Sequence, residues 1–156
     1  MSFLANESPP PADQEPTIEN DGWFPDVDPV EIRAQARLDG TVTPERLKQA
    51  ILAAMADVNQ QLAVHKAQQL QVGHAALAEV PGPDLGGTRI WLIHYRHATL
   101  AHVQANLAEQ YRSFDTTGAG DKKAEPLEAT ADHHRRNLHW AIAAITARPR
   151  STVELI

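Results

Sequence analysis

The 156-residue sequence contains no cysteine, few aromatic residues and no long apolar run. The absence of cysteine excludes disulfide scaffolds, thiolate metal sites and cysteine nucleophiles. Because aromatic residues make up only 5% of the chain, alanine and leucine must fill most of the core, which favours helices over β-sandwiches. No stretch approaches the roughly 20 apolar residues of a membrane-spanning helix, and residues 1–28 lack the pattern of a signal peptide. The composition predicts a soluble protein with no membrane contact.

Basic residues are missing from the first 32 positions, which hold eight acidic ones. The other 124 residues carry twelve acidic and fourteen basic side chains, so the net charge of −6 comes from the start of the chain. An acidic chain with no basic stripe is a poor candidate for gripping duplex DNA through its phosphates. The acidic start is instead typical of an arm outside the main body.

Proline and aromatic residues mark residues 1–28 as an N-terminal arm. Six of the eleven prolines lie at or before position 29, which predicts an extended and irregular chain. Two large aromatics follow a turn signal in the string NDGWFPD, and such side chains commonly anchor interfaces. The alternative is that they pack over the protein's own helices. The predicted contact arm consists of Trp23, Phe24, Pro25, Asp26 and Asp28.

Two helix starts are signalled by a capping residue followed by proline. Asp28 and Pro29 predict a short helix over residues 29–38. Thr43 and Pro44 begin a long helix that runs to about residue 72, where a glycine stops it. Its buried face follows from apolar residues three and four apart: Leu47, Ile51, Met55, Val58 and Leu62.

Two further long helices are predicted over residues 90–114 and 121–148. The buried row of the first is Ile90, Ile93, His97, Leu100, Gln104, Leu107, Tyr111 and Phe114. The buried row of the second is Leu127, Thr130, His134, Leu138, Ala141 and Ile145. Residues 79–88, with two prolines and three glycines, are expected to form a loop.

Long helices joined by short connections pack antiparallel. The predicted fold is therefore all-α: a small bundle of three long helices plus one short N-terminal helix, with extended N- and C-terminal tails. The expected divisions are the acidic, proline-rich arm at 1–28, the helical bundle at 29–148 and a C-terminal tail at 149–156.

The last residues are β-branched and apolar, which is unusual for a frayed terminus. An extended segment of this kind can add as a strand to the sheet edge of another chain. The predicted docking tail consists of Arg150, Ser151, Thr152, Val153, Glu154, Leu155 and Ile156.

Eight histidines raise the hypothesis of a metal-dependent enzyme. His94, His97 and His102, with Glu109, could suggest a zinc site. However, His102 falls about 100° around the helix from the other two, and no HExxH pattern exists. The simpler interpretation is that His97 and His134 are partly buried, hydrogen-bonded residues of the helix faces, and we expect no bound metal.

Other motifs with possible chemistry are incomplete. Residues 82–88 resemble a phosphate-binding loop, but Thr88 stands where the lysine must reach the phosphates. No GxSxG motif marks a nucleophile. A helical nucleic-acid-binding domain remains an alternative, because basic residues are present at Arg135, Arg136, Arg148 and Arg150. With no catalytic constellation, the sequence predicts neither an enzyme nor a cofactor.

Four separated strings carry a resemblance that covers about residues 18–156. They are NDGWFPDVDP, LDGTVTPERL, YRSFDTTGAGDKKAEPLEATAD and the terminal RPRSTVELI. In this order they resemble the head completion protein (GPL) family of contractile-tailed temperate phages. The resemblance implies a structural protein without catalytic residues, found in the neck of the virion after assembly in the host cytoplasm.

The same resemblance implies partners. Proteins of this kind are similar to head–tail connectors, which form a ring, usually twelve-fold, beneath the portal protein after DNA packaging. The ring extends the DNA channel, which passes genomic DNA without specific binding, and carries a downstream neck or tail-terminator protein. The contact arm and docking tail are the expected contacts with the portal and the neighbouring subunit, in either assignment. Trp91 and Tyr95, four apart and off the expected buried row, are candidates for the ring interface.

Overall fold

The computed structural model describes residues 15–114 and 121–147. Within these ranges five α-helices make up most of the chain, which confirms the predicted all-α fold. The elements in chain order are α1 (Pro29–Gln35), α2 (Pro44–Gln61), α3 (Ala63–Gln71), the 3₁₀ turn η2 (Leu77–Glu79), β1 (Asp84–Leu85), β2 (Thr88–Arg89), α4 (Ile90–Phe114) and α5 (Asp121–Ile145). None of the helices in the described part is long and apolar enough to cross a membrane.

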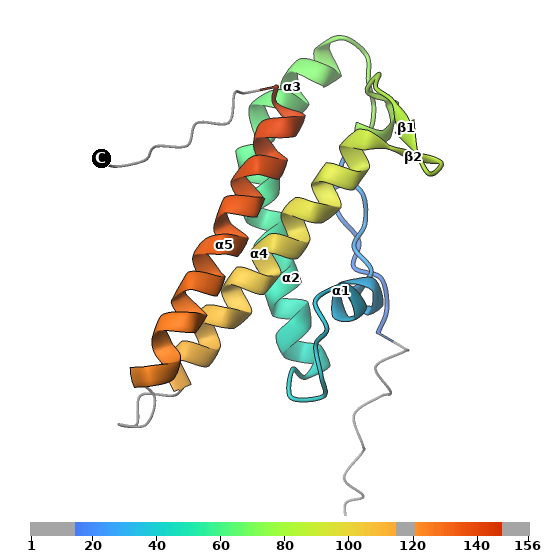
Figure 1. Ribbon diagram of the computed structural model, residues 1–156. Coiled ribbons are helices and arrows are strands. Elements are labelled where there is room, and N and C mark those ends of the chain that lie inside the picture. The colour runs from blue at the N-terminus through green and yellow to red at the C-terminus, as the bar shows by residue number, and fades with distance from the viewer. Residues whose placement is uncertain (1–14, 115–120, 148–156) are drawn as a thin grey trace, which may run out of the picture.

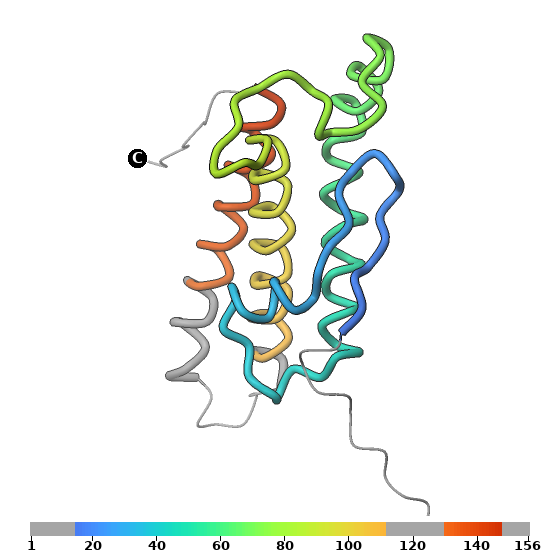
Figure 2. The backbone as a smooth tube through the Cα atoms, turned by 90° about the vertical axis from the view of Figure 1, so that its right-hand side faces the viewer, coloured from blue at the N-terminus to red at the C-terminus, as the bar shows by residue number. Residues whose placement is uncertain are grey.

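The three long helices α2, α4 and α5 form the body, with α4 in the middle. α4 packs along α5 and against α2, and successive long helices run in opposite directions (Figure 1). Turned by 90°, the tube shows α5, α4 and α2 in a row, with α3 rising beyond the end of α2 (Figure 2). This arrangement gives the body two opposite edges, one formed by α5 and the other by α2.

Both predicted helix caps are present. The Asp28 side chain accepts a hydrogen bond of 2.8 Å from the backbone N–H of Val30, and the Thr43 side chain accepts one of 3.3 Å from Arg46. The first helix is shorter than expected, ending at Gln35 rather than near residue 38. Arg37 adopts a left-handed conformation with φ of 53°, which turns the chain out of the helix.

The predicted helix over residues 44–72 is divided into α2 and α3 at Leu62. This residue has φ and ψ of −94° and 2°, although neither proline nor glycine marks a break in the sequence there. Its side chain is fully buried in the core, so packing accompanies the change of direction. The five residues expected to form the buried face, from Leu47 to Leu62, are all buried as predicted.

The predicted buried row of α4 is largely wrong, although Leu107 is buried and Leu100 packs against the core as expected. His97 is exposed, and the fully buried residues are instead Tyr95, Ala98, Thr99 and Val103. α4 lies between α2 and α5, and a helix covered on two sides does not show a single apolar stripe. Alanines on α4 let the backbones approach closely, which a search for large apolar residues overlooks.

The expected row of α5 is partly right. Leu138, Ala141 and Ile145 are buried and His134 is partly buried, as predicted, whereas Thr130 is exposed. The buried His134 Nδ1 has no hydrogen-bond partner among the described residues, contrary to the expectation. The helix ends at Ile145 rather than at residue 148.

The second half of the predicted loop over residues 79–88 is a short β-hairpin, which spans residues 84–89. β1 pairs antiparallel with β2, and the two residues between them, Gly86 and Gly87, have φ of 58° and 76°. Two positive φ values in succession are typical of the type I′ turn that suits a two-residue hairpin. The hairpin therefore replaces the phosphate-loop geometry that the glycine spacing resembled.

The structure moves the boundary of the arm. Residues 15–28 belong to the body, because Ile18, Trp23, Phe24 and Val27 are buried among side chains of the helices. Ile18 and Val27 pair as an antiparallel bridge, with backbone hydrogen bonds of 2.8 and 3.0 Å. Residues 18–27 thus form a second small hairpin lying against α2 (Figure 2), and the helical-body division begins before residue 29.

Replacing Trp23 with alanine should therefore destabilise the isolated chain. Trp23 is 4% exposed and belongs to the same core cluster as Phe24 and Tyr95. Removing a buried tryptophan typically costs about 3–5 kcal/mol of unfolding free energy. Urea denaturation of the purified protein measures the change. Val64→Ala is the control, because Val64 is 67% exposed and its loss should cost at most about 0.5 kcal/mol. Unchanged stability in Trp23→Ala would restore the interpretation of Trp23 as an intermolecular anchor.

Candidate interaction site

The predicted contact arm is held against the helices by its own aromatic pair. The Trp23 indole N–H donates a hydrogen bond of 3.0 Å to the carbonyl of His74, and the Phe24 ring stacks on Tyr95 at 5.1 Å. The two rings meet edge to face at 4.8 Å. Both side chains are buried, so the alternative of packing over the protein's own helices is correct, and the prediction of an outward anchor is wrong for this pair.

The other arm residues also have partners within the chain. The Asp26 carboxylate accepts a hydrogen bond of 2.8 Å from the backbone N–H of Asn20, and the carbonyl of Pro25 accepts one of 2.8 Å from the Asn20 side chain. Asp28 caps α1. Asp26 remains exposed and is the arm residue most available to another molecule.

A closed ring of three hydrogen bonds fixes this arm to two helices. The Tyr95 hydroxyl on α4 donates to Asn59 Oδ1 on α2 at 2.7 Å. Asn59 Nδ2 donates to Asn20 Oδ1 at 2.8 Å, and Asn20 Nδ2 donates back to the Tyr95 oxygen at 2.8 Å. Each member is both donor and acceptor, and hydrogen bonds arranged in this way polarise one another. Sequence reasoning missed Asn59 entirely, because nothing local distinguishes it from an ordinary helical asparagine.

Tyr95 is therefore not a surface residue. Its side chain is fully buried, which removes it from the candidate ring interface. Burial raises the pKa of the Tyr95 hydroxyl to about 12, so the group stays protonated and keeps its role as donor. Trp91 is half-buried, and its indole N–H donates 2.9 Å to the carbonyl of Pro81. It packs so closely on Gly82 that a Cβ there would lie 2.6 Å from the indole nitrogen.

The two tyrosines offer a matched test of the ring. Tyr95→Phe leaves Asn59 Oδ1 without its donor from Tyr95 and removes one of the two acceptors of the Asn20 amide, and a stranded buried polar group costs about 1–3 kcal/mol. Tyr111→Phe removes a hydroxyl that contacts Thr41 on the surface, which should cost less than about 0.5 kcal/mol. Urea denaturation of both variants compares the losses. Equal, small changes would mean that the ring contributes nothing beyond an exposed contact.

Two ion pairs attach residues 15–28 to the helices. The carboxylate of Glu15 receives two hydrogen bonds from the Arg33 guanidinium, at 2.9 and 2.5 Å, in a nearly buried pair. Asp21 pairs with Lys66 of α3 at 2.7 Å. Burial acts to raise the pKa of Asp21, but the hydrogen bonds from Lys66 and from backbone amides outweigh it and lower the pKa. The acidic charge of the arm is thus partly neutralised inside the molecule.

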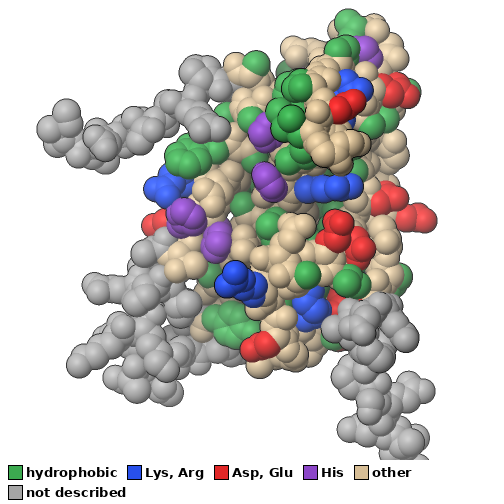
Figure 3. Space-filling view, turned by 45° about the vertical axis from the view of Figure 1, so that its right-hand side comes forward, with side chains coloured by type: hydrophobic (Ala, Val, Ile, Leu, Met, Phe, Trp, Pro, Cys, Tyr) green, Lys and Arg blue, Asp and Glu red, His purple; other side chains and the backbone are tan. Residues whose placement is uncertain are grey.

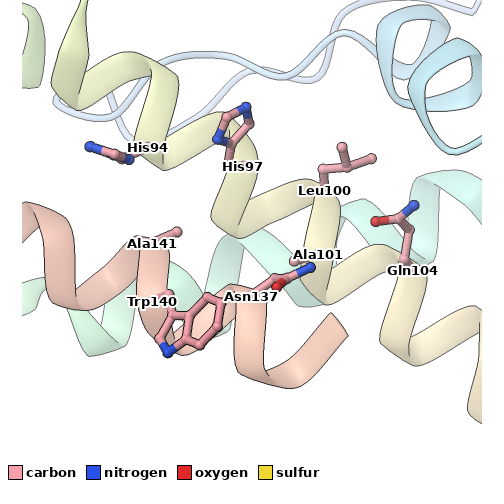
Figure 4. Close-up of a pocket in the computed structure, with 8 residues that line it drawn as sticks. All are labelled: His94, His97, Leu100, Ala101, Gln104, Asn137, Trp140 and Ala141. Carbon is pink, nitrogen blue, oxygen red and sulfur yellow. The ribbon is translucent and has the colours of Figure 1, made fainter. Parts of the chain in front are cut away.

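The histidines proposed as zinc ligands do not converge. His94 and His97 line a hollow of about 330 Å³ between α4 and α5, together with Trp140 and Asn137 (Figure 4). His102 instead faces α2, where its Nε2 lies 3.4 Å from Asp57, and Glu109 pairs with Arg135 of α5. Among the residues that the structure describes, no group of three or more candidate ligands lies close enough to hold a metal ion.

Two of the four arginines proposed to bind nucleic acid, Arg135 and Arg136, interact with neighbouring side chains of the chain. Arg135 pairs with Glu109 and with Asp132, the latter at 2.7 Å. The Arg136 guanidinium lies over the Trp140 ring at 5.1 Å. Acidic and basic side chains are interspersed over the face shown in Figure 3. Arg148 and the docking tail, from Arg150 to Ile156, lie outside the described residues.

Two partly buried histidines make stability depend on pH. Burial lowers the pKa of His65 and, together with the neighbouring His133, that of His134. A lowered pKa means that the unfolded chain binds more protons, so stability is full above the ordinary value of about 6.5 and falls as the pH drops below it. Thermal melts between pH 7.5 and 5 should show this loss.

His65→Gln should flatten that pH dependence. A single proton supplies a slope of at most about 1.4 kcal/mol per pH unit, so the difference between variant and wild type lies within that bound. His139→Gln, at an exposed position of α5, is the control. An identical slope in wild type and His65→Gln would show that His65 does not contribute.

Sequence comparison assigns the chain to a family. Residues 18–156 match the family described as phage head completion protein (GPL), and the chain belongs to this family. The head completion/stabilization protein of Escherichia phage P2 is 40% identical over 148 residues, covering 95% of this chain and 88% of that protein. No solved structure matches the chain significantly. The resemblance seen in the four sequence strings, and its extent from about residue 18, are confirmed.

Proposed function

We propose that this chain is a structural component of a phage virion that completes the head after DNA packaging. The observation that carries the proposal is membership of the head completion family over residues 18–156. The named relative from phage P2 is matched over 88% of its length, so the proposal concerns the whole protein rather than a shared fragment. On this proposal the chain works through contacts with other proteins and is not an enzyme.

The finer proposal is that the chain acts as a head–tail connector. It binds beneath the portal as a ring of about twelve copies, extends the DNA channel and provides the platform for a downstream neck or tail-terminator protein. The net charge of −6 supports a channel that passes DNA without gripping it. In the described part of α5, Arg135 pairs with acidic side chains and Arg136 lies over the Trp140 ring.

The docking tail is assigned to the portal. Residues 152–155 alternate polar and apolar types and are followed by Ile156, a pattern suited to strand addition. The N-terminal aromatic pair is buried in its own body, which supports giving this role to the other terminus. Trp91, half-buried beside the hollow between α4 and α5, is retained as a candidate for the contact with a neighbouring subunit.

Deleting Val153–Ile156 should abolish portal binding and leave the body folded. The helices of the body end at Ile145, so the melting temperature should stay within about 1–2 °C of wild type while portal affinity falls at least tenfold. Native mass spectrometry of the chain mixed with the portal protein of the same phage measures binding, and circular dichroism measures folding. Deleting residues 2–12 is the matched control.

Each outcome decides a different point. A truncated chain that still binds the portal would refute the assignment of the tail. A lowered melting temperature would show that the tail packs on its own bundle. Failure of the full-length chain to bind the portal, or to form any larger assembly, would refute the connector proposal.

A further inference from the structure

One exposed surface of the body has few charged side chains. It runs along the outer side of α2 and α3, and between Gln49 and Gly73 the acidic and basic residues, histidine aside, are Asp57 and Lys66 alone. Their side chains are 42% and 27% exposed, and each lies against a partner, His102 and Asp21 respectively. A stretch of this length on a soluble surface normally carries several charges.

The same surface gathers exposed aliphatic side chains. Leu52, Val64, Leu70 and Val72 are 39%, 67%, 48% and 67% exposed, and they make up four of the six large hydrophobic residues classed as exposed in the described part of the chain. No residue of α3 is fully buried, and its contacts with the core come from partly buried side chains: Lys66 lies over the Phe24 ring and His65 lies against Trp23. We call the surface formed by Gln49, Leu52, Ala53, Ala56, Gln60, Ala63, Val64, Ala67, Leu70, Gln71 and Val72 the α2–α3 face.

A second surface without acidic or basic side chains lies elsewhere on the body. It is the hollow between α4 and α5, lined by His94, His97, Leu100, Ala101, Gln104, Asn137, Trp140 and Ala141. Three other hollows in the described ranges are each lined by at least one acidic and one basic residue. In the close-up, α2 runs behind α4 and α5, so the hollow opens away from the α2–α3 face (Figure 4).

The dimensions and chemistry of the two surfaces match. The nine residues of α3 span about 13 Å, and the lining positions on α4, from His94 to Gln104, span about 15 Å. Aliphatic side chains from α3 would pack against Leu100 and the Trp140 ring, beside the Arg136 guanidinium that lies over that ring. Acidic or basic side chains of a partner would meet no Asp, Glu, Lys or Arg among the residues that line the hollow.

We propose that the α2–α3 face of one copy docks into the α4–α5 hollow of the next copy of this chain. This inference rests on the proposed ring and specifies its subunit contact. Two different surfaces on opposite sides of one protomer make a heterologous contact, which closes into a ring when the rotation between neighbours permits. The contact places the exposed side of α3 between subunits.

The test uses one charge on each surface. Val64→Glu alters the α2–α3 face, and His97→Glu alters the exposed rim of the hollow. Each variant should need at least a tenfold higher concentration to assemble, alone or on the portal, as measured by native mass spectrometry. Leu85→Glu is the matched control, because it puts the same charge on an exposed aliphatic position of the hairpin, outside both surfaces. Circular dichroism should show all three variants folded.

Mixing the two variants gives the decisive result. Val64→Glu keeps an intact hollow and His97→Glu keeps an intact α2–α3 face, so an equimolar mixture should form a heterodimer that stops there. Neither variant should form a dimer alone. The heterodimer would have twice the 17.1 kDa mass of the chain. Its formation would test the contact whatever the alignment of α3 along the hollow.

The inference is overturned if both variants assemble like wild type, because the ring would then use other surfaces. It is also overturned if both are impaired but their mixture gives no heterodimer, because the two surfaces would then not meet each other. In either case the wild-type ring would still stand. Failure of wild type to assemble under any condition would remove the ring proposal and this contact together.

Discussion

The closed ring of hydrogen bonds between Asn20, Asn59 and Tyr95 is the constraint on which the rest of the body depends. It joins the N-terminal hairpin, α2 and α4, and each side chain satisfies the others in a setting where an unpaired group is costly. The ring places Phe24 on the Tyr95 ring and brings Trp23 over the end of α3. The hairpin in turn covers the apolar side of α2 that would otherwise be open. An acidic, proline-rich stretch with the composition of a free arm is thereby built into the core.

Local signals predicted the helices well because they act over a few residues. Capping at Asp28 and Thr43, and apolar spacing along α2, depend only on near neighbours, and the structure contains all of them. The side of α4 that is buried depends on two other elements, and its alanines carry no large apolar signal. Leu85-Gly86-Gly87-Thr88 did contain a usable signal, since two glycines between short extended segments favour a two-residue hairpin.

The interaction residues were harder to predict, for a related physical reason. Trp23, Phe24 and Tyr95 are the kind of side chains that anchor interfaces between molecules, and they are equally suited to a core that has few aromatics. Which use applies is decided by the Asn20–Asn59–Tyr95 ring, whose members are 36 to 75 residues apart. The histidine-rich stretch of α4 shows the same limit. His94 and His102 lie on one helix, yet they face different neighbours, and only the packing of α2 and α5 reveals this.

The body separates the surfaces that fold the protomer from those available for assembly. Trp23, Phe24 and Tyr95 are buried in one core cluster, while Trp91 and Trp140 lie at or beside the hollow between α4 and α5. Its large aliphatics on α3 are left exposed, although burying them within the protomer would have stabilised it. Charges are instead concentrated in the hairpin and along α5, where they pair within the chain. A protein whose role is to hold neighbours in a fixed geometry needs a protomer that folds without those neighbours, and also uncharged surfaces that remain available until they meet.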